Sequence, residues 1–393
     1  MSNPHLPPEI RDHIVDLLHD EPETLKECCL VSKSWVPRTR KYLFASVELN
    51  SEEDRRSWIK KFPDPSNSPA FHTHSLKISS TQVIRAAGGW IQAFSRIASL
   101  HLRGSVDQYF YDSEAPLAPF YKLSPTLKSL CVYSTTLPYP ELFTLVRSSP
   151  LLEDLTLAGH DMLLWNGDDP HGSQGVVPSA SPVLTGSLDL MIEGGMEYTA
   201  RQLLNLPNGL HFRRLRFSWD QEEDSQWIMK LVVGCSNSLE YLDFRRSGAF
   251  LLISGWGRDL PSFVGNPSPA SLDLSKATKL RDATFWSGSP RADWITMALQ
   301  TITPKHREFQ QISIYVPYYL TCFDVGDSVR RIVGETDYRQ WLDLDCLLVH
   351  LWESHSIRPR VVCATLGDRE QSTKYCVGRL LPKITRRGII HLV

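Results

Sequence analysis

The sequence predicts a fold of α+β or α/β repeat class, with a short helical segment at the N-terminus followed by alternating strands and helices. The first forty or so residues carry apolar side chains at helical spacing, interrupted by turn-forming residues, which predicts three short helices. From residue 75 onward a short strand-like pattern recurs at intervals of 25 to 60 residues. A loop rich in proline and serine, Pro63–Pro69, separates the two regions.

The overall composition is that of an ordinary folded protein. Apolar residues make up 42% of the 393-residue chain and charged residues 22%, and the net charge is −2. This balance gives no reason to expect a nucleic acid or a membrane as partner. We find no signal-peptide pattern and no run long enough to span a membrane, and the eight cysteines contain no CxxC pair. We therefore expect reduced thiols and a cytoplasmic and/or nuclear protein.

The first predicted helix begins at the tandem prolines 7 and 8, because proline is tolerated in a first helical turn. Ile10, Ile14, Leu17 and Leu18 follow at spacings of four, seven and eight residues, which places them on one helical face. This face is the first candidate for burial, either inside the protein or against a partner.

Two more short helices are predicted before residue 45. The second begins somewhere between Asp20 and Thr24, and both starts remain open because Pro22 suits a first turn and Thr24 has capping-box spacing. The third runs roughly from Ser34 to Phe44. So small a set of helices has little core of its own, which points to a need for a partner.

The segment from Leu6 to Phe44 resembles the F-box. The resemblance rests on the residues LPPEI, the apolar face of helix one, the acidic linker with Pro22, and the run CLVSKSW before a basic third helix. It implies a three-helix F-box that docks on a Skp-type adaptor and, through it, on cullin. By match to the family, the docking surface would consist of Leu6, Pro7, Pro8, Ile10, Ile14, Leu17, Leu25, Leu30, Val31 and Trp35.

A plainer interpretation of the same segment remains open. The three helices would then be a terminal cap on the repeat domain, with the same apolar residues facing inward. The predicted domain boundaries are an F-box over 1–48, a helix and linker over 49–74, and a leucine-rich-repeat-like domain with a C-terminal cap over 75–393.

The recurring strand pattern has apolar residues at positions one, four and six. It begins at Ile97, Leu127, Leu152, Phe212, Leu239 and Phe309, with a weaker copy at Leu280 and partial copies at Leu76 and Leu188. Amphipathic helices are predicted before several copies, for example over 140–146, 224–233 and 292–302. A strand plus a helix at such intervals is typical of an irregular leucine-rich-repeat-like solenoid, like the degenerate repeats that follow F-boxes in large fungal families.

The central residue of each apolar-x-apolar strand should point away from the core. The candidates for target binding, with simple solvent exposure as the alternative for each, are Lys77, His101, Thr156, Asp189, Arg216 and Asp243. Two long loops, over 159–187 and 245–270, are further candidates. At the C-terminus we predict a helix over 338–353, a strand over 360–365, a helix over 371–381 and a strand over 389–393.

We find little that indicates catalysis. The sequence lacks the phosphate-binding, dinucleotide-binding, nucleophile-elbow and zincin motifs. His72 with His74, and His350 with His355 near Asp345, are weak metal-ligand candidates. We therefore expect no enzyme, no cofactor and no resident metal.

The resemblance predicts a substrate receptor of an SCF-type cullin–RING ubiquitin ligase, with an unidentified protein as target. The alternative is a leucine-rich-repeat interaction scaffold without a role in ubiquitin transfer. A third and weaker alternative is a hydrolase in a nonstandard fold. Adaptor and cullin binding distinguish these predictions.

Overall fold

The computed structural model describes residues 6–104, 117–133, 139–159, 182–192, 195–219, 222–246, 272–287, 291–316, 334–363 and 370–388. The predicted strand over 389–393 and most of the two predicted long loops lie outside these residues. The chain divides into two compact units, the first running from Met1 to Gly159 and the second from Leu184 to Val393, apart from the segment between them. The predicted boundaries after residues 48 and 74 both lie inside the first unit.

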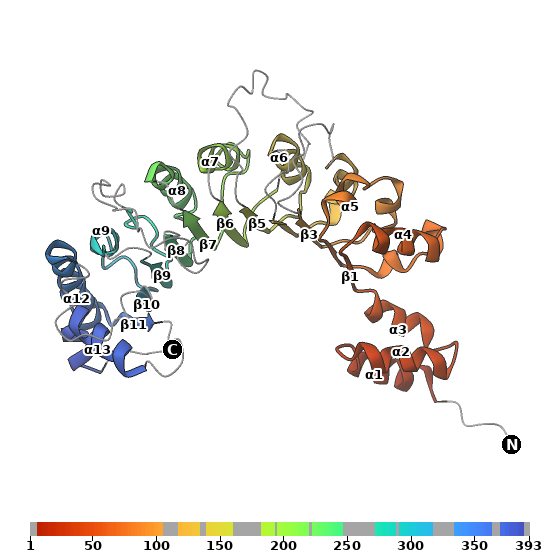
Figure 1. The fold of residues 1–393 in the computed structure, drawn as a ribbon, viewed down its shortest axis with the longest axis horizontal. Coiled ribbons are helices and arrows are strands. Elements are labelled where there is room, and N and C mark those ends of the chain that lie inside the picture. Colours follow the sequence, from red (N-terminus) through yellow and green to blue (C-terminus); the bar gives the residue numbers. More distant parts are fainter. Residues whose placement is uncertain are drawn as a thin grey trace. The chain divides into compact units, whose positions relative to one another are not determined.

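The first unit begins with three short helices, α1 (Pro8–Leu17), α2 (Pro22–Val31) and α3 (Val36–Leu43). Figure 1 shows these helices following one another at the N-terminal end of the ribbon. Each has a proline in its first turn, where the missing amide hydrogen has no helical partner to lose. The shared interior of these helices is small, and its buried side chains are Val15, Leu25, Cys28 and Thr39.

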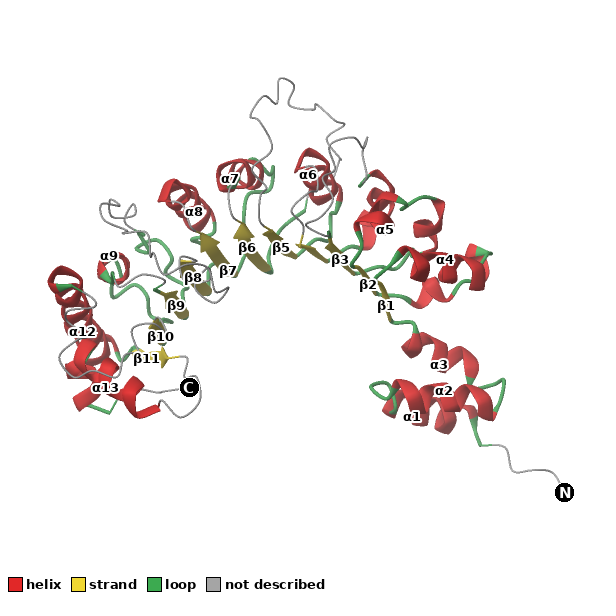
Figure 2. Ribbon diagram, in the orientation of Figure 1, coloured by secondary structure: helices red, strands yellow, loops and turns green. Residues whose placement is uncertain are grey.

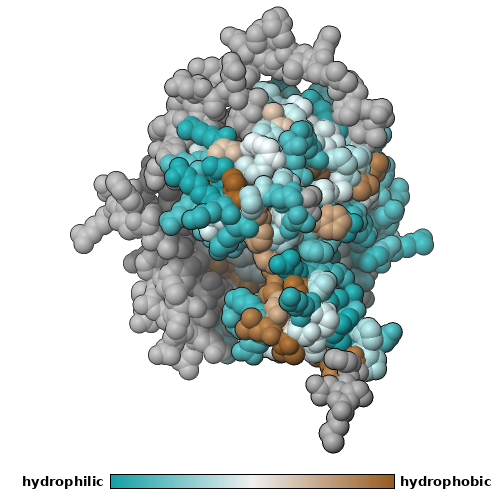
Figure 3. Space-filling view, turned by 90° about the vertical axis from the view of Figure 1, so that its right-hand side faces the viewer, coloured by the Kyte–Doolittle hydropathy of each residue, from teal (hydrophilic) through white to brown (hydrophobic). Residues whose placement is uncertain are grey.

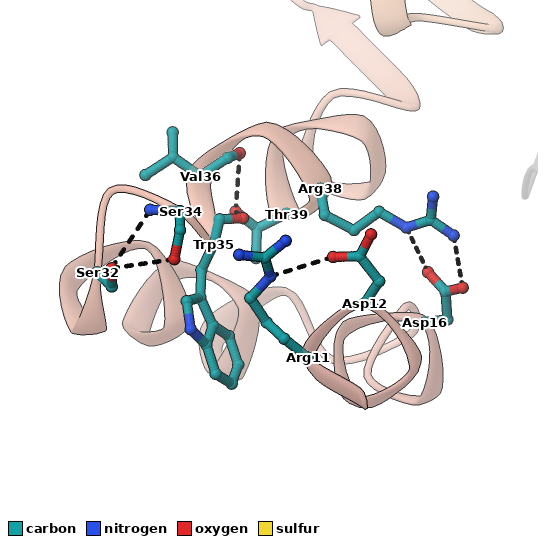
Figure 4. A network of polar contacts seen from close by, with 9 residues as sticks. All are labelled: Arg11, Asp12, Asp16, Ser32, Ser34, Trp35, Val36, Arg38 and Thr39. Carbon is teal, nitrogen blue, oxygen red and sulfur yellow. Dashed lines mark hydrogen bonds and ion pairs between the residues drawn. The ribbon is translucent and has the colours of Figure 1, made fainter. Parts of the chain in front are cut away.

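A polar network ties α1 to α3 (Figure 4). The Arg38 guanidinium donates two hydrogen bonds to the Asp16 carboxylate, at 2.7 and 2.5 Å, and the Tyr42 hydroxyl donates a third at 2.7 Å. These hydrogen bonds, from Arg38 first and Tyr42 second, hold the pKa of Asp16 well below its usual range. On the other side of α3, the Thr39 hydroxyl donates to the carbonyls of Trp35 and Val36 and contacts the Cys29 sulfur at 2.8 Å.

The rest of the first unit alternates short strands with helical connections. Its strands are β1 (Ser46–Leu49), β2 (Ser75–Ile78), β3 (Ser99–Arg103), β4 (Ser129–Tyr133) and β5 (Asp154–Gly159). Its connections include α4 (Glu52–Lys61), η1 (Pro65–Asn67), η2 (Pro69–His72), α5 (Thr81–Arg85), η3 (Gly89–Ala93), η4 (Ala118–Thr126) and α6 (Tyr139–Ser148). The Ser51 hydroxyl caps α4 in a capping box with Asp54.

The second unit continues the alternation. Its strands are β6 (Ser187–Ile192), β7 (Arg214–Trp219), β8 (Tyr241–Arg246), β9 (Asp282–Trp286), β10 (Gln311–Val316) and β11 (Arg358–Cys363). Its helices are α7 (Met196–Leu204), α8 (Glu222–Gly234), α9 (Asp293–Gln300), α12 (Glu335–His355), α13 (Glu370–Leu380) and α14 (Pro382–Arg386).

The described strands form one all-parallel sheet of eleven strands, in which strand order follows chain order. Within each unit the helices cover one face of the strands (Figure 2). The apolar side chains on that face lie in register from strand to strand, and each is at most 2% exposed: Leu76, Leu100, Leu130 and Leu155 in the first unit, and Leu188, Leu215, Leu242, Ala283 and Ile312 in the second.

The predicted fold class, a three-helix F-box followed by a leucine-rich-repeat-like solenoid, is wrong. The finding that overturns it is the single eleven-stranded parallel sheet with its helices, a fold of α/β type. The recurring apolar pattern specifies a strand and its register with its neighbours, and it carries no information on the connections between strands. Those connections differ in kind, from the nine-residue 3-10 segment η4 to the 21-residue helix α12, so the pattern does not define a repeating unit.

The Asp16 network predicts a pH dependence of the N-terminal helices. Because the pKa of Asp16 is lowered in the folded protein, the ionised carboxylate stabilises the fold above its unfolded pKa of about 3.9, and this stabilisation is lost as the pH falls toward the folded-state pKa. We expect Asp16→Asn to speed amide hydrogen exchange of α1 at neutral pH in the full chain. The difference from wild type should shrink below about pH 4.

Asp12→Asn is the control for this experiment, because the ion pair of Asp12 among the described residues is with its chain neighbour Arg11, at 3.2 Å, and its charge acts on Arg38 without a hydrogen bond. It should leave the exchange of α1 nearly unchanged at every pH. An equal effect of both substitutions would show that the Asp16–Arg38 pair does not hold α1 on α3.

Candidate functional site

The surface of α1 and α2 exposes large apolar side chains to solvent. Five of the twelve large apolar residues that are exposed in the described part of the chain lie between Leu6 and Val31. Their exposed fractions are 53% for Leu6, 49% for Ile10, 68% for Leu17, 87% for Leu30 and 69% for Val31. Figure 3 shows hydrophobic atoms gathered at the lower end of the viewed face, beside the N-terminal segment. We call these five residues the helical apolar surface.

The other residues of the predicted docking surface lie at different depths. Pro7 and Pro8 are exposed beside the helical apolar surface, whereas Ile14 and Trp35 are half-buried. Leu25 is only 1% exposed and packs inside the helices, so a partner cannot reach it in this conformation. The resemblance to the F-box placed both Leu25 and Leu30 on the docking surface, although five residues correspond to about 140° around a helix and so separate the two side chains.

The charges around the helical apolar surface are mostly negative. Residues 1–31 contain seven acidic and two basic residues. An exposed apolar centre with a charged surround is the usual composition of a protein-binding surface. Removing each square ångström of this apolar surface from water would contribute about 25 cal/mol.

A second candidate surface is the open face of the strands. In the first unit Lys77, His101, Cys131 and Thr156 lie side by side in register, one on each of β2 to β5. Lys77 pairs with Glu48 at 2.7 Å, with both side chains nearly half exposed, which makes it a weak surface pair. The His101 ring lies 3.0 Å from the Ser99 hydroxyl, and burial, followed by the Lys77 charge, lowers the pKa of His101.

In the second unit the structure joins the three predicted residues into one charge cluster. Arg216 on β7 donates to Asp189 on β6 and to Asp243 on β8, each at 3.0 Å. Burial raises the pKa of Asp189, and the Arg216 charge opposes that shift. The second carboxylate oxygen of Asp189, Oδ1, is buried and has no hydrogen-bond partner among the described residues.

This cluster continues into an aromatic pair that the sequence prediction missed. Arg245 donates to Asp243 at 2.8 Å, and its guanidinium lies 4.5 Å from the ring centroid of Trp286. Trp286 in turn stacks on Tyr315, with centroids 3.5 Å apart and planes 7° from parallel. The signal was present in the sequence, because these residues lie two positions after the central residues and therefore on the same face of their strands.

We call Asp189, Arg216, Asp243, Arg245, Trp286 and Tyr315 the polar strand face. Its members come from five adjacent strands of the second unit and are partly exposed. The indole nitrogen of Trp286, like Asp189 Oδ1, is a buried polar atom without a hydrogen-bond partner in the described residues. The exposed charges and aromatic area of this face suit selective recognition of a protein segment.

Asp345 and His350, which were weak candidates for metal binding, make hydrogen bonds within the protein. Asp345, 1% exposed, accepts hydrogen bonds from the backbone amides of Lys383 and Ile384 at 2.8 and 3.0 Å, and so caps the start of α14. The His350 ring nitrogen lies 3.2 Å from the Ser354 hydroxyl. Among the described residues no group of three or more His, Cys, Asp or Glu side chains is placed to hold a metal ion.

No protein-family model matches the chain, and a search of curated proteins finds no similar sequence. Within the part of the chain that the structure describes, no helix combines the length and the apolar character needed to cross a membrane. The two surfaces described above are therefore the main basis for a functional proposal.

Arg216 is the central residue of the charge cluster, and its removal gives a testable result. Arg216→Gln leaves Asp189 and Asp243 side by side without their shared cation, which should destabilise the second unit by about 1–3 kcal/mol at neutral pH. Because the pKa of Asp189 is already raised, the loss should diminish as the pH falls and the carboxylates take up protons. Urea unfolding of the full chain at several pH values measures this.

Arg214→Gln is the matched control. Arg214 lies on the same strand and face and stacks over the Tyr241 ring at 4.8 Å, but it makes no ion pair within the described residues. Its substitution should change stability little and without a pH trend. If both variants unfold alike, Arg216 does not hold the two carboxylates together.

Proposed function

We propose that the chain is a substrate receptor of an SCF-type cullin–RING ubiquitin ligase, working in the cytoplasm and/or nucleus. The helical apolar surface docks on a Skp-type adaptor, and the strands present a face that holds a protein target. The observation that carries the proposal is the exposure of Leu30 and Val31, at 87% and 69%, beside exposed apolar residues of α1. Side chains of this kind on the surface of packed helices favour a permanent protein partner.

The resemblance of the segment from Leu6 to Phe44 to the F-box supplies the identity of that partner. The helical apolar surface would form the centre of an interface of standard size, about 1,200–2,000 Å² in total. The acidic residues around it would form the rim, where charges steer association more than they add affinity. Leu25 would contribute indirectly, by packing inside the three helices.

The polar strand face supports the second half of the proposal. Arg216 and Arg245 are held by Asp189 and Asp243, so their guanidinium groups are positioned before a partner arrives. Positioned arginine and aromatic side chains are the types that contribute most at protein interfaces.

The proposed mechanism is proximity rather than catalysis by this chain. With the adaptor at one surface and the target at another, target lysines would meet the ubiquitin-loaded enzyme at a raised effective concentration. No nucleophile, metal or cofactor of this chain is needed for that role. If the chain binds the adaptor but never recruits cullin, it acts as an interaction scaffold instead.

The docking surface is tested by replacing exposed apolar side chains with charged ones that leave the core intact. The double variant Leu30→Asp with Val31→Asp should leave the thermal melt of the full chain nearly unchanged, because both side chains are already exposed. Its affinity for purified Skp-type adaptor should fall at least about a hundredfold, because two charges would be buried without partners. Titration calorimetry with the full chain measures the affinity, and pull-down of cullin through the adaptor tests assembly.

Two comparison variants make this result specific. Leu151→Asp changes another leucine of the first unit, 50% exposed, and should leave adaptor affinity as in wild type. Leu25→Ala empties a buried position and should destabilise the helices by about 2–5 kcal/mol. Undiminished adaptor binding by the Leu30 and Val31 variant, or no binding by the wild-type chain, would overturn the proposed function.

A further inference from the structure

A cluster of basic side chains gathers where α3 meets the segment around η2. It consists of Arg40 and Lys41 from the last turn of α3, His72 and His74 at the end of η2 and just after it, and Arg96, which follows η3. We call these five residues the α3 basic cluster. Its members come from three separate stretches of sequence, so only the fold brings them together.

The proximity of the five groups is visible in their effects on one another. After burial, the charges of Arg96, Arg40, His74 and Lys41, in that order, lower the pKa of His72. The ring nitrogen of His74 lies 3.4 Å from the backbone carbonyl of Arg96. The backbone amide of His74 also donates to the Ala45 carbonyl at 2.8 Å, which fixes this segment at the end of α3.

One member of the cluster is held in place by an exposed aromatic ring. The guanidinium carbon of Arg96 lies 3.7 Å from the centroid of Phe71, whose side chain is 44% exposed. Such stacking fixes the plane of the guanidinium while leaving its N–H groups free to donate. An arginine oriented in this way is prepared to bind a carboxylate through two parallel hydrogen bonds.

Carboxylates of the described residues offset the charge of this cluster only in small part, through the action of the Lys41 charge on Asp16. None of its five members makes an ion pair with a carboxylate there, whereas nearby basic residues are paired: Arg38 with Asp16, Lys77 with Glu48 and Arg55 with Glu52. The dipole of α3 favours cations at its C-terminus and accounts for Arg40 and Lys41. It does not account for His72, His74 and Arg96, which belong to other segments.

We propose that the α3 basic cluster is a docking site for an acidic polypeptide segment, one with several Asp or Glu side chains close together in sequence. Its carboxylates would bind Arg96 and Arg40 and offset the positive charge gathered around His72. Exposed Phe71 would contact the apolar parts of that segment. A nucleic acid fits less well, because the whole chain carries a charge of −2 and residues 1–31 are acidic.

This proposal does not rest on adaptor docking, since none of the five basic residues belongs to the helical apolar surface. Its test uses no adaptor, so the two proposals succeed or fail separately. The probe is a fluorescein-labelled oligoglutamate peptide, and its binding to the full chain is followed by fluorescence anisotropy at low and high salt.

The decisive variant combines Arg40→Gln, Lys41→Gln and Arg96→Gln. It should weaken oligoglutamate binding at least about tenfold, and added salt should reduce wild-type affinity by screening the same charges. The matched control combines Lys60→Gln, Lys61→Gln and Lys128→Gln, three exposed lysines of the first unit outside the cluster. It removes the same charge and should bind the peptide within about twofold of wild type.

A site-specific measurement complements the affinities. In the wild-type chain, saturating oligoglutamate should raise the pKa of His72, read from the chemical shifts of its imidazole, because bound carboxylates offset the neighbouring cations. Any of three results would overturn the proposal: equal weakening by the control variant, an unchanged His72 titration, or tighter binding of an oligothymidylate of the same length and label.

Discussion

The structure depends on one constraint, the burial of the apolar rows that adjacent parallel strands share. Residues such as Leu188, Leu215 and Leu242 lie in register and are sealed by the helices on the same side. A parallel sheet requires each connection to return across a face, and here the helices within each unit lie on one face. Side chains alternate along a strand, so burial of one row places its neighbours on the other face. The open strand face is therefore a direct consequence of how the core is made.

The N-terminal helices are stabilised differently, because they have too few side chains to make a large core. Their interior holds Val15, Leu25, Cys28 and Thr39, and the pair of Asp16 with Arg38 adds a directional link between α1 and α3. The remaining apolar side chains of α1 and α2 are left outside. In a segment this small, exposure of the apolar face costs solubility unless a partner covers it.

The sequence predicted those features that depend on residues close together in the chain. The spacing of apolar residues predicted most strands and the helices α6, α8 and α9 near their observed positions. Local patterns could not give the fold class, because the connections between strands differ in length and kind. The resemblance to the F-box placed Leu25 and Leu30 together on the docking surface, whereas the structure buries Leu25 and exposes Leu30.

The contacts that were missed join residues far apart in the chain. Arg245, Trp286 and Tyr315 meet only because β8, β9 and β10 pair in a particular register. The α3 basic cluster likewise depends on the return of the chain from η3 to α3. Periodicity identifies which face a residue occupies, but the neighbour on the next strand depends on loop lengths that follow no simple rule.

The two surfaces differ in the kind of partner that they fit, and this difference connects the fold to the proposed function. Burial of the helical apolar surface against a complementary apolar surface is favourable and non-directional. It therefore suits one constant partner. The polar strand face discriminates between partners, because a like charge placed beside Asp189 or Arg216 would cost on the order of several kcal/mol. The proposed receptor role fits this division, with a constant adaptor contact on the helices and a selective target contact on the strands.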